Sequence, residues 1–222
     1  MKSYLSLAWK ELKAQRVTAI LILIAVILSS LMTTVIGQSI GILQAMRVQQ
    51  AERLNGSRYA TFHQLTQQQA QTLHDDPRLT DVGDVLYLGS TGLGSSSLKL
   101  SLREYHDDAL AMYPSIGKIK EGRLPEAAKE MALPEDALQY LDKNAAVGDT
   151  IRLTLTVSTM DGLLPEVEYT ADFTLTGILE SSYLGYSTGT VQGIVGEGSA
   201  EALLPEEYRL ISTDFKTQSK QD

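Results

Sequence analysis

The residues Gly185-Tyr-Ser187-Thr-Gly189 have the G-x-S-x-G spacing of a turn that exposes a nucleophilic serine. Such a serine needs a histidine as general base, and in that fold the histidine follows the serine along the chain. The last histidine here is His106, which precedes Ser187. We therefore interpret 185–189 as a Gly/Ser turn and predict no serine hydrolase site.

Three glycines, Gly89, Gly92 and Gly94, superficially match a phosphate-binding loop. Their spacing is not G-x-G-x-x-G, and no Gly-Lys-Ser/Thr follows them. The next predicted element is a strand, whereas a phosphate site needs the N-terminus of a helix. We predict that this segment binds no nucleotide and that the chain is not itself an ATPase.

The three histidines, His63, His74 and His106, lie on separate predicted elements, and the chain has no cysteine. The run His106-Asp107-Asp108 has residue types that bind metal ions, but a solvated acidic loop is the interpretation we favour. No carboxylate lies in an apolar stretch that would raise its pKa for acid–base catalysis. We predict no catalytic residue, no metal site and no cofactor.

Charge is distributed unevenly along the 222 residues, whose formal net charge is −8. This acidic balance argues against binding to nucleic acid, which needs a clustered basic face. Residues 1–16 are basic, with one acidic residue and four basic ones, whereas residues 17–46 contain no charged residue. The remainder of the chain therefore carries all the excess acidity.

The uncharged stretch predicts a transmembrane helix over 17–43. Roughly 20 apolar residues cross a bilayer, and the stretch supplies them by Ile36. A cleaved signal peptide has an apolar region of about 7–15 residues followed by a small-x-small site, which is not found here. A buried core helix would not lie beside a basic cluster. By the positive-inside rule, residues 1–16 are cytoplasmic and the acidic bulk lies outside the plasma membrane.

Both flanks of the predicted membrane helix are helix-compatible. Residues 1–16 place Trp9 and other apolar residues at helical spacing, which predicts an amphipathic segment at the inner interface, with a plain juxtamembrane tail as the alternative. Residues 44–56 turn polar and end at Asn55-Gly56, a helix-ending pair. We predict that the helix continues outward as a stalk.

Residues 57–222 predict a mixed α+β domain. A strand at 58–64, a helix at 67–74 with Thr66 as N-cap, and a strand at 82–88 form a βαβ unit. This unit is expected to be a porter-like layer beside a β-rich subdomain. A Gly/Ser loop is predicted at 89–97, followed by a half-buried strand in which Leu98, Leu100 and Leu102 alternate with polar residues.

The clearest β pattern is a hairpin. Apolar and polar residues alternate strictly over 151–157 and again over 167–175. The Gly/Ser/Thr-rich stretch 185–198 predicts a loop, 199–204 a short helix and 208–215 a strand. Because that strand has no visible partner, we expect the C-terminal part of the domain to be incomplete. The loops at 89–97 and 185–198 are either partner surfaces or inert connectors.

One progression of motifs resembles a known family. Gly122-Arg-Leu-Pro125, then Glu130-Met-Ala-Leu-Pro134, then Val147-Gly-Asp-Thr150, and finally Phe173-Thr-Leu-Thr-Gly177 look like the outer core domain of FtsX/MacB-type ABC transporter permeases. A basic lead-in containing Trp, a first membrane helix and then this domain is also the family's order. The resemblance assigns family-motif roles to Gly122, Arg123, Pro125, Glu130, Leu133, Pro134, Gly148, Asp149, Phe173 and Gly177.

These motif residues are those of turns and short elements rather than of catalysis. Gly122 and Pro125 predict a turn, 130–133 a strand, and Pro134 the start of a helix over 135–141. Gly148-Asp149 predicts a β-turn that leads into the strand at Ile151.

The resemblance implies a non-catalytic permease subunit that couples ATP hydrolysis by a separate ABC ATPase to motion of its outer domain. It also implies a homodimer or a heterodimer with another permease, and it leaves the substrate unspecified. Family members have further membrane helices after this domain, which this sequence does not show. The alternatives are a single-pass membrane-anchored binding or sensor module and, with no catalytic constellation behind it, a secreted enzyme with an uncleaved anchor.

Overall fold

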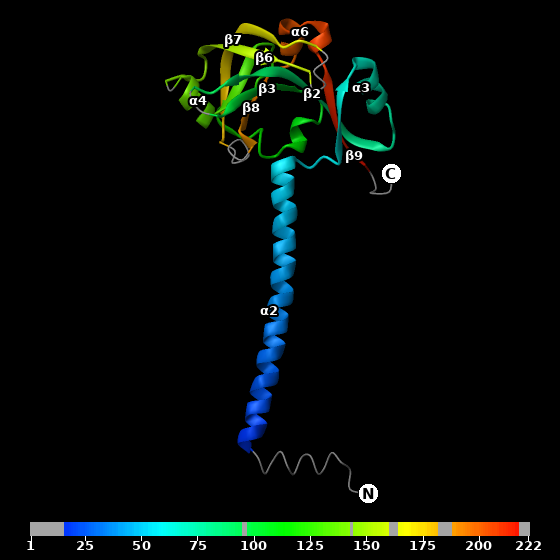
Figure 1. Cartoon of the computed structure of the whole chain (residues 1–222), viewed down its shortest axis with the longest axis vertical. Coiled ribbons are helices and arrows are strands. Elements are labelled where there is room, and N and C mark those ends of the chain that lie inside the picture. The colour runs from blue at the N-terminus through cyan, green and yellow to red at the C-terminus, as the bar shows by residue number, and fades with distance from the viewer. Residues whose placement is uncertain (1–15, 95–96, 143, 160–163, 182–187, 218–222) are drawn as a thin grey trace. The chain divides into compact units, whose positions relative to one another are not determined.

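The computed structural model describes residues 16–94, 97–142, 144–159, 164–181 and 188–217 (Figure 1). The chain divides into two compact units, residues 1–51 and residues 52–222. The predicted amphipathic segment falls almost wholly on residues 1–15, which lie outside the described residues.

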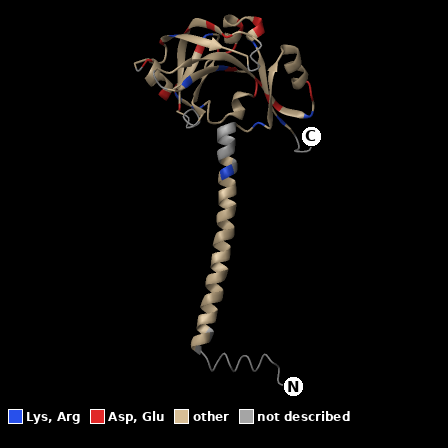
Figure 2. Ribbon diagram, in the orientation of Figure 1, with Lys and Arg blue, Asp and Glu red and all other residues tan. Residues whose placement is uncertain are grey.

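The first unit is dominated by one α-helix, α2 (Arg16–Asn55), of 40 residues. Its part Ile20–Arg47 has a mean hydropathy of 2.6 and no buried residue, and is long and apolar enough to cross a membrane. Residues 17–46 of this helix include no charged side chain (Figure 2). At 1.5 Å per residue the whole helix is about 60 Å long, twice a hydrocarbon core of about 30 Å. The expected continuous apolar helix is therefore confirmed.

Hydroxyl side chains inside α2 bond to the helix itself. Thr33 Oγ1 donates to the carbonyl of Ser29 at 2.9 Å, and Ser39 Oγ donates to that of Val35 at 2.8 Å. These bonds satisfy polar groups that would otherwise be unpaired in hydrocarbon. The hydroxyls therefore do not argue against a membrane span.

The second unit is a mixed α+β domain, which confirms the expected fold class. Its described strands are β1 (Ala60–Leu65), β2 (Leu79–Gly92), β3 (Lys99–Tyr105), β4 (Ile119–Gly122), β5 (Glu130–Pro134), β6 (Thr150–Val157), β7 (Val167–Leu179), β8 (Thr190–Val195) and β9 (Ile211–Thr217). Its helices are α3 (Gln67–His74), α4 (Glu135–Leu141) and α6 (Ser199–Leu203), with 3₁₀ turns at Leu110–Met112 and Glu206–Tyr208.

The strands join into one sheet that closes on itself. The order is β1-β9-β2-β3-β8-β5-β7-β4, and β6 pairs with both β7 and β2. The pairings β2-β3-β8-β5-β7-β6-β2 therefore form a ring of six strands, closed where Ser90 pairs with Thr156. Next to this pair, a Cβ on Gly89 would lie 2.9 Å from the carbonyl oxygen of Thr156. Glycine at position 89 lets the two backbones approach at the closure.

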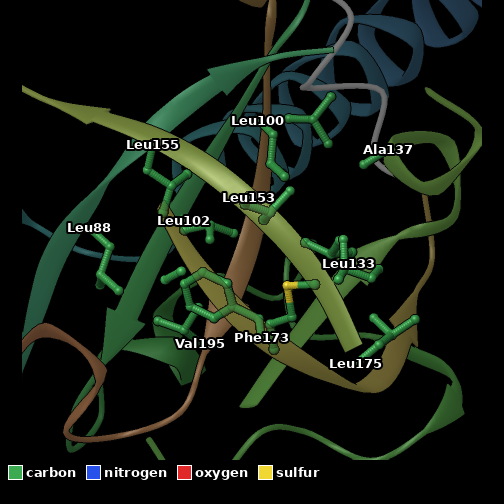
Figure 3. Packing of buried hydrophobic residues seen from close by; sticks show 14 of the residues in the cluster. Leu88, Leu100, Leu102, Leu133, Ala137, Leu153, Leu155, Phe173, Leu175 and Val195 are labelled. Carbon is green, nitrogen blue, oxygen red and sulfur yellow. The ribbon is translucent and has the colours of Figure 1, made fainter. Parts of the chain in front are cut away.

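The main hydrophobic core fills the ring (Figure 3). Side chains from β2, β3, β5, β6, β7 and β8 meet there, among them Leu88, Leu100, Leu102, Leu133, Leu153, Leu155, Phe173, Leu175 and Val195. The predicted β6–β7 hairpin supplies several of them. It is antiparallel, with Ile151 opposite Phe173, and the odd residues of β6 are buried as the alternation predicted. Its connecting turn, 160–163, lies outside the described residues.

The predicted βαβ unit forms from β1, α3 and β2, and it encloses a third strand. Thr66 caps α3 as predicted, because its hydroxyl accepts from the amide of Gln69 and the Gln69 side chain accepts from the amide of Thr66. Strand β9 lies between β1 and β2 and is antiparallel to both. The expectation that the last strand has no partner was therefore wrong, since its partners are the first two strands of the domain.

Two predicted loops contain strands. Strand β2 continues to Gly92, so the first half of 89–97 is sheet, and residues 95–96 lie outside the described residues. Strand β8 occupies 190–195 within the predicted loop 185–198, and it pairs with β3 and β5 in the middle of the sheet. A Cβ on Gly193 would lie 2.6 Å from Leu133 Cδ2 and 2.8 Å from Leu102 Cδ2. That glycine is therefore required by packing and does not mark a turn.

Candidate functional site

A cavity of about 680 Å³ lies in the second unit, on the polar face of the sheet formed by β8, β3, β2, β9 and β1. Residues of β3 alternate between the two faces of the sheet. Leu100 and Leu102 enter the core, whereas Lys99, Ser101 and Arg103 line the cavity. We call this space the polar cavity. Its lining includes Arg58, Thr61, His63, Tyr87, Ser90, Lys99, Ser101, Arg103, Tyr113, Thr190, Gln192, Tyr208, Ser212 and Asp214.

At one side of the polar cavity, Asp214 of β9 is the centre of a hydrogen-bond network. Its side chain is 1% exposed and accepts hydrogen bonds from the hydroxyls of Thr61 and of Tyr113, the latter at 2.6 Å. Arg58 Nε lies 3.3 Å from Asp214 Oδ1, and the Arg58 guanidinium lies 5.1 Å from the centre of the Tyr113 ring. The one carboxylate of the cavity is thus neutralised by Arg58 and satisfied within the fold.

Burial also keeps the tyrosines beside this network protonated. The pKa of Tyr113 is raised first by burial and then by its hydrogen bond to Asp214. Burial raises the pKa of Tyr105 to about 12, although the nearby Arg103 guanidinium opposes the rise. The Tyr105 hydroxyl donates to Gln192 at 3.3 Å. Both hydroxyls are therefore hydrogen-bond donors at neutral pH rather than bases.

The remaining cations of the polar cavity have no carboxylate partner among the described residues. Lys99 and Arg103 belong to none of the ion pairs there, which leaves three cations against one carboxylate and a formal surplus of two positive charges. The Oγ of Ser101 and the Nε of Arg103 are buried and lack a hydrogen-bond partner in the described part of the chain. Each such atom costs about 1–3 kcal/mol of stability. The floor of the cavity therefore carries excess positive charge and two polar atoms without a partner in the described part of the chain.

A second buried carboxylate, Glu104, faces away from the polar cavity. Its side chain is 2% exposed and accepts from the amides of Gly198 and Ala200 at 2.8 and 2.7 Å, and it lies 2.8 Å from His106 Nε2. Burial alone would raise the pKa of Glu104, but these hydrogen bonds outweigh it and lower the pKa. Since both amide contacts join β3 to the start of α6, we assign Glu104 a role in holding that short helix.

The three histidines are separated, as their positions in the sequence indicated. His63 lies 3.1 Å from Ser212 at the polar cavity, His74 lies 3.1 Å from Asp84, and His106 lies against Glu104. Asp107 does not join His106. Ligand atoms of His74, Asp84 and Asp107 instead lie within 4.8 Å of one another. Both oxygens of Asp84 already have partners, because Oδ1 accepts from Thr213 and Oδ2 contacts His74. We interpret this group as a link between α3 and the sheet.

The family-motif residues come together along β7. Gly122 ends β4, where its φ is +78° and a Cβ would lie 2.3 Å from the Thr176 carbonyl oxygen. Arg123 donates to both oxygens of Glu130, at 2.9 and 2.6 Å. Glu130 begins β5, which runs parallel to β7. The bidentate pair lowers the pKa of Glu130 to about 2, with help from the amides of Glu126 and Ala127.

The other motif residues lie at bends and in the core around the same strand. Pro125 is in the β4–β5 connection, and Pro134 precedes the helix α4 as predicted. Leu133 and Phe173 are fully buried. The amide of Gly148, where φ is +103°, donates to Leu175 at 2.7 Å, and Asp149 Oδ2 accepts from the amide of Ala146 at 2.8 Å. Gly177 lies opposite Gly122 in β7. None of the motif residues lines the polar cavity.

Sequence patterns gave only a partial signal for the polar cavity. The alternation in 98–103 identified Lys99, Ser101 and Arg103 as one face of a strand, and that face was expected to meet solvent. Ser101 is instead 3% exposed. Thr190 and Gln192 lay in a predicted loop, and Ser212 and Asp214 in a strand without a known partner. The Ser187 of the G-x-S-x-G pattern lies outside the described residues.

Comparison with known proteins finds similarity among solved structures. No family model matches the chain, and no curated protein is significantly similar to it. The chain is similar to the crystal structure of the periplasmic region of MacB from Actinobacillus actinomycetemcomitans, at 15% sequence identity and a TM-score of 0.42. The match covers 72% of this chain and 67% of that one.

Proposed function

We propose that this chain is a permease subunit of an FtsX/MacB-type ABC transporter, in which a separate cytoplasmic ATPase moves an extracytoplasmic domain. The observation that carries the proposal is the uninterrupted helix α2, which extends from an apolar span into a polar segment before the sheet domain begins. The order of the motifs between Gly122 and Gly177 supports it. The domain acts by binding and movement and has no catalytic role.

A helix of this kind suits mechanical transmission. It is stiff along its axis and is about 60 Å long, so displacement at its cytoplasmic end reaches the outer end. In this proposal residues 1–16 lie nearest the ATPase, residues 44–56 form the stalk, and the acidic domain lies outside the plasma membrane. A second permease chain completes the transporter.

Orientation is tested first, and the absence of cysteine makes the test simple. Single cysteines are introduced by Ser3→Cys, in the basic N-terminus, and by Gln139→Cys, at an exposed position of α4. In intact cells a membrane-impermeant maleimide should label the Gln139→Cys protein, and it should label the Ser3→Cys protein only after permeabilisation. The reverse labelling would refute the proposed orientation, and labelling of both in intact cells would refute a membrane span.

Partnership with an ATPase is tested by isolating the chain from native membranes with an antibody against residues 57–222. Mass spectrometry should then identify an ABC ATPase and a second permease chain. If no ATPase is recovered, the alternative of a single-pass binding or sensor module is preferred. The polar cavity is the observation that favours that alternative.

Mechanical coupling is tested by inserting Gly-Pro after Ala45. An Ala-Ala insertion at the same place is the matched control, because it shifts the helix equally but keeps it helical, whereas proline breaks it. The Gly-Pro variant should bind the ATPase normally, but its ATP hydrolysis should no longer be coupled to transport. Equal behaviour of the two insertions would contradict a mechanical stalk.

A further inference from the structure

We propose that the polar cavity is a binding site for a small organic anion that carries a carboxylate or phosphate group. The site is built on β3, with Lys99 and Arg103 as the anion-binding residues and Ser101 between them. It involves none of the motif residues, so it does not depend on the transporter role proposed above.

The charge of the cavity is the first reason. The chain as a whole is acidic, at −8, but the polar cavity gathers Arg58, Lys99 and Arg103 around the single carboxylate of Asp214. Arg58 and Asp214 pair with each other. The two cations of β3 therefore face the cavity from one strand, four residues apart, and ammonium and guanidinium groups are those with which carboxylates and phosphates pair.

Unsatisfied polar atoms on the floor are the second reason. Ser101 is 3% exposed, and its hydroxyl has no partner in the described part of the chain. The same holds for Nε of Arg103, two residues along the same strand. Buried polar groups normally have partners, and exceptions mark places where a ligand or water completes the set. The opposite face of β3 packs Leu100 and Leu102 into the core.

The size and lining of the cavity restrict the class of ligand. About 680 Å³ is within the range of pockets for small molecules. The walls come from six strands, β1, β2, β3, β6, β8 and β9, and from the segments around Tyr113, Ser158 and Tyr208, so the space suits a compact ligand rather than an extended chain. Hydroxyl and amide groups of Ser90, Thr190 and Gln192 are available to the uncharged part of the ligand. A polyhydroxylated anion suits this combination.

Binding is measured by isothermal titration calorimetry on the full chain in detergent micelles, with three probes. Glucose 6-phosphate and glucuronate carry the two candidate anionic groups, and glucose is their neutral counterpart. We expect at least one of the anions to bind with a Kd of about 1 mM or tighter, and glucose not to bind. The stronger of the two anions identifies the preferred group.

Charge-removing variants locate the site. Lys99→Gln and Arg103→Gln should each weaken anion binding about tenfold. Lys118→Gln removes the same charge at an exposed position outside the cavity and should leave binding unchanged. Lys99 is exposed, so its substitution leaves a folded protein even if that of Arg103 does not.

Three results would overturn the proposal: no binding of either anion at 10 mM, equal binding of glucose, or equal weakening by Lys99→Gln and Lys118→Gln. These results leave the labelling and ATPase experiments unaffected. Failure of the anion site is therefore distinguishable from failure of the proposed transporter role.

Discussion

Replacing His106 by glutamine should destabilise the sheet domain by an amount that depends on pH. His106 Nε2 lies 2.8 Å from Glu104 Oε1, and the His106 side chain is 24% exposed while that of Glu104 is 2% exposed. A hydrogen bond between charged groups in such a place contributes about 1.5–3 kcal/mol, and one with a neutral donor about 0.5–1.5 kcal/mol. The substitution should therefore lower the free energy of unfolding by about 1 kcal/mol more at a pH where His106 is protonated in the wild type.

The direction in which this stabilisation changes with pH follows from the two pKa shifts. Glu104 is the main cause that raises the pKa of His106 above its ordinary 6.5, so this stabilisation is complete below pH 6.5 and is lost as pH rises through the raised pKa. Hydrogen bonds outweigh burial and lower the pKa of Glu104 below 4.5. Its stabilisation is therefore present above pH 4.5 and is lost at more acidic pH. The pair contributes most between pH 4.5 and 6.5.

Thermal unfolding of the full chain in detergent, followed by near-ultraviolet circular dichroism of its tyrosines, measures the effect. A difference of 1 kcal/mol shifts Tm by about 2–4 °C in a domain of this size. The loss of Tm on His106→Gln should be larger at pH 5.5 than at pH 8.5 by about that amount. Thr154→Val, which removes a hydroxyl contact to Thr170 at 2.9 Å and no titratable group, is the control and should cost the same at both pH values. A His106→Gln cost that is equal at both pH values, or larger at pH 8.5, would refute the reasoning.

Two further predictions use the same unfolding assay. Gly177→Ala should destabilise the domain by about 1–3 kcal/mol, because the new Cβ would lie 2.3 Å from the Arg123 carbonyl oxygen. Gly92→Ala is the control and should be nearly neutral, because no atom lies within 4 Å of the new Cβ. Equal Tm values for the two variants would contradict this packing. Ser101→Ala should raise stability by about 1 kcal/mol, because it removes a buried hydroxyl that has no partner among the described residues. Thr213→Val should lower stability, because the Thr213 hydroxyl donates to Asp84 at 2.6 Å. A loss of Tm on Ser101→Ala would show that its hydroxyl is satisfied.

Local patterns predicted the elements whose partners lie nearby in the chain. The capped helix α3 and the β6–β7 hairpin were found because capping and alternation are properties of short stretches. Strand β8 was missed because its glycines and hydroxyl residues resemble those of a loop. Glycine marks both turns and places where side chains pack against a backbone, and only the contact of Gly193 with Leu133 and Leu102 distinguishes them.

The polar face of β3 could be read from the sequence, but its enclosure could not. Lys99, Ser101 and Arg103 alternate with leucines, which established a two-faced strand. Whether the polar face meets solvent depends on β8 and β9, which come from residues about 90 and 110 positions further along the chain. The same long-range pairing brought Arg58 to Asp214.

By itself the sequence determined that the chain begins with a basic segment and an apolar helix long enough to cross a membrane, followed by an acidic α+β domain. Composition and short-range periodicity are enough for those conclusions, because they depend on solvent preference and on local backbone geometry. Tertiary structure alone decided that β9 lies between β1 and β2, that six strands close into a ring, and that two cations of β3 face a cavity. Those features depend on strand pairing between distant residues, and the alternation of residues within one strand does not identify the strand with which it pairs.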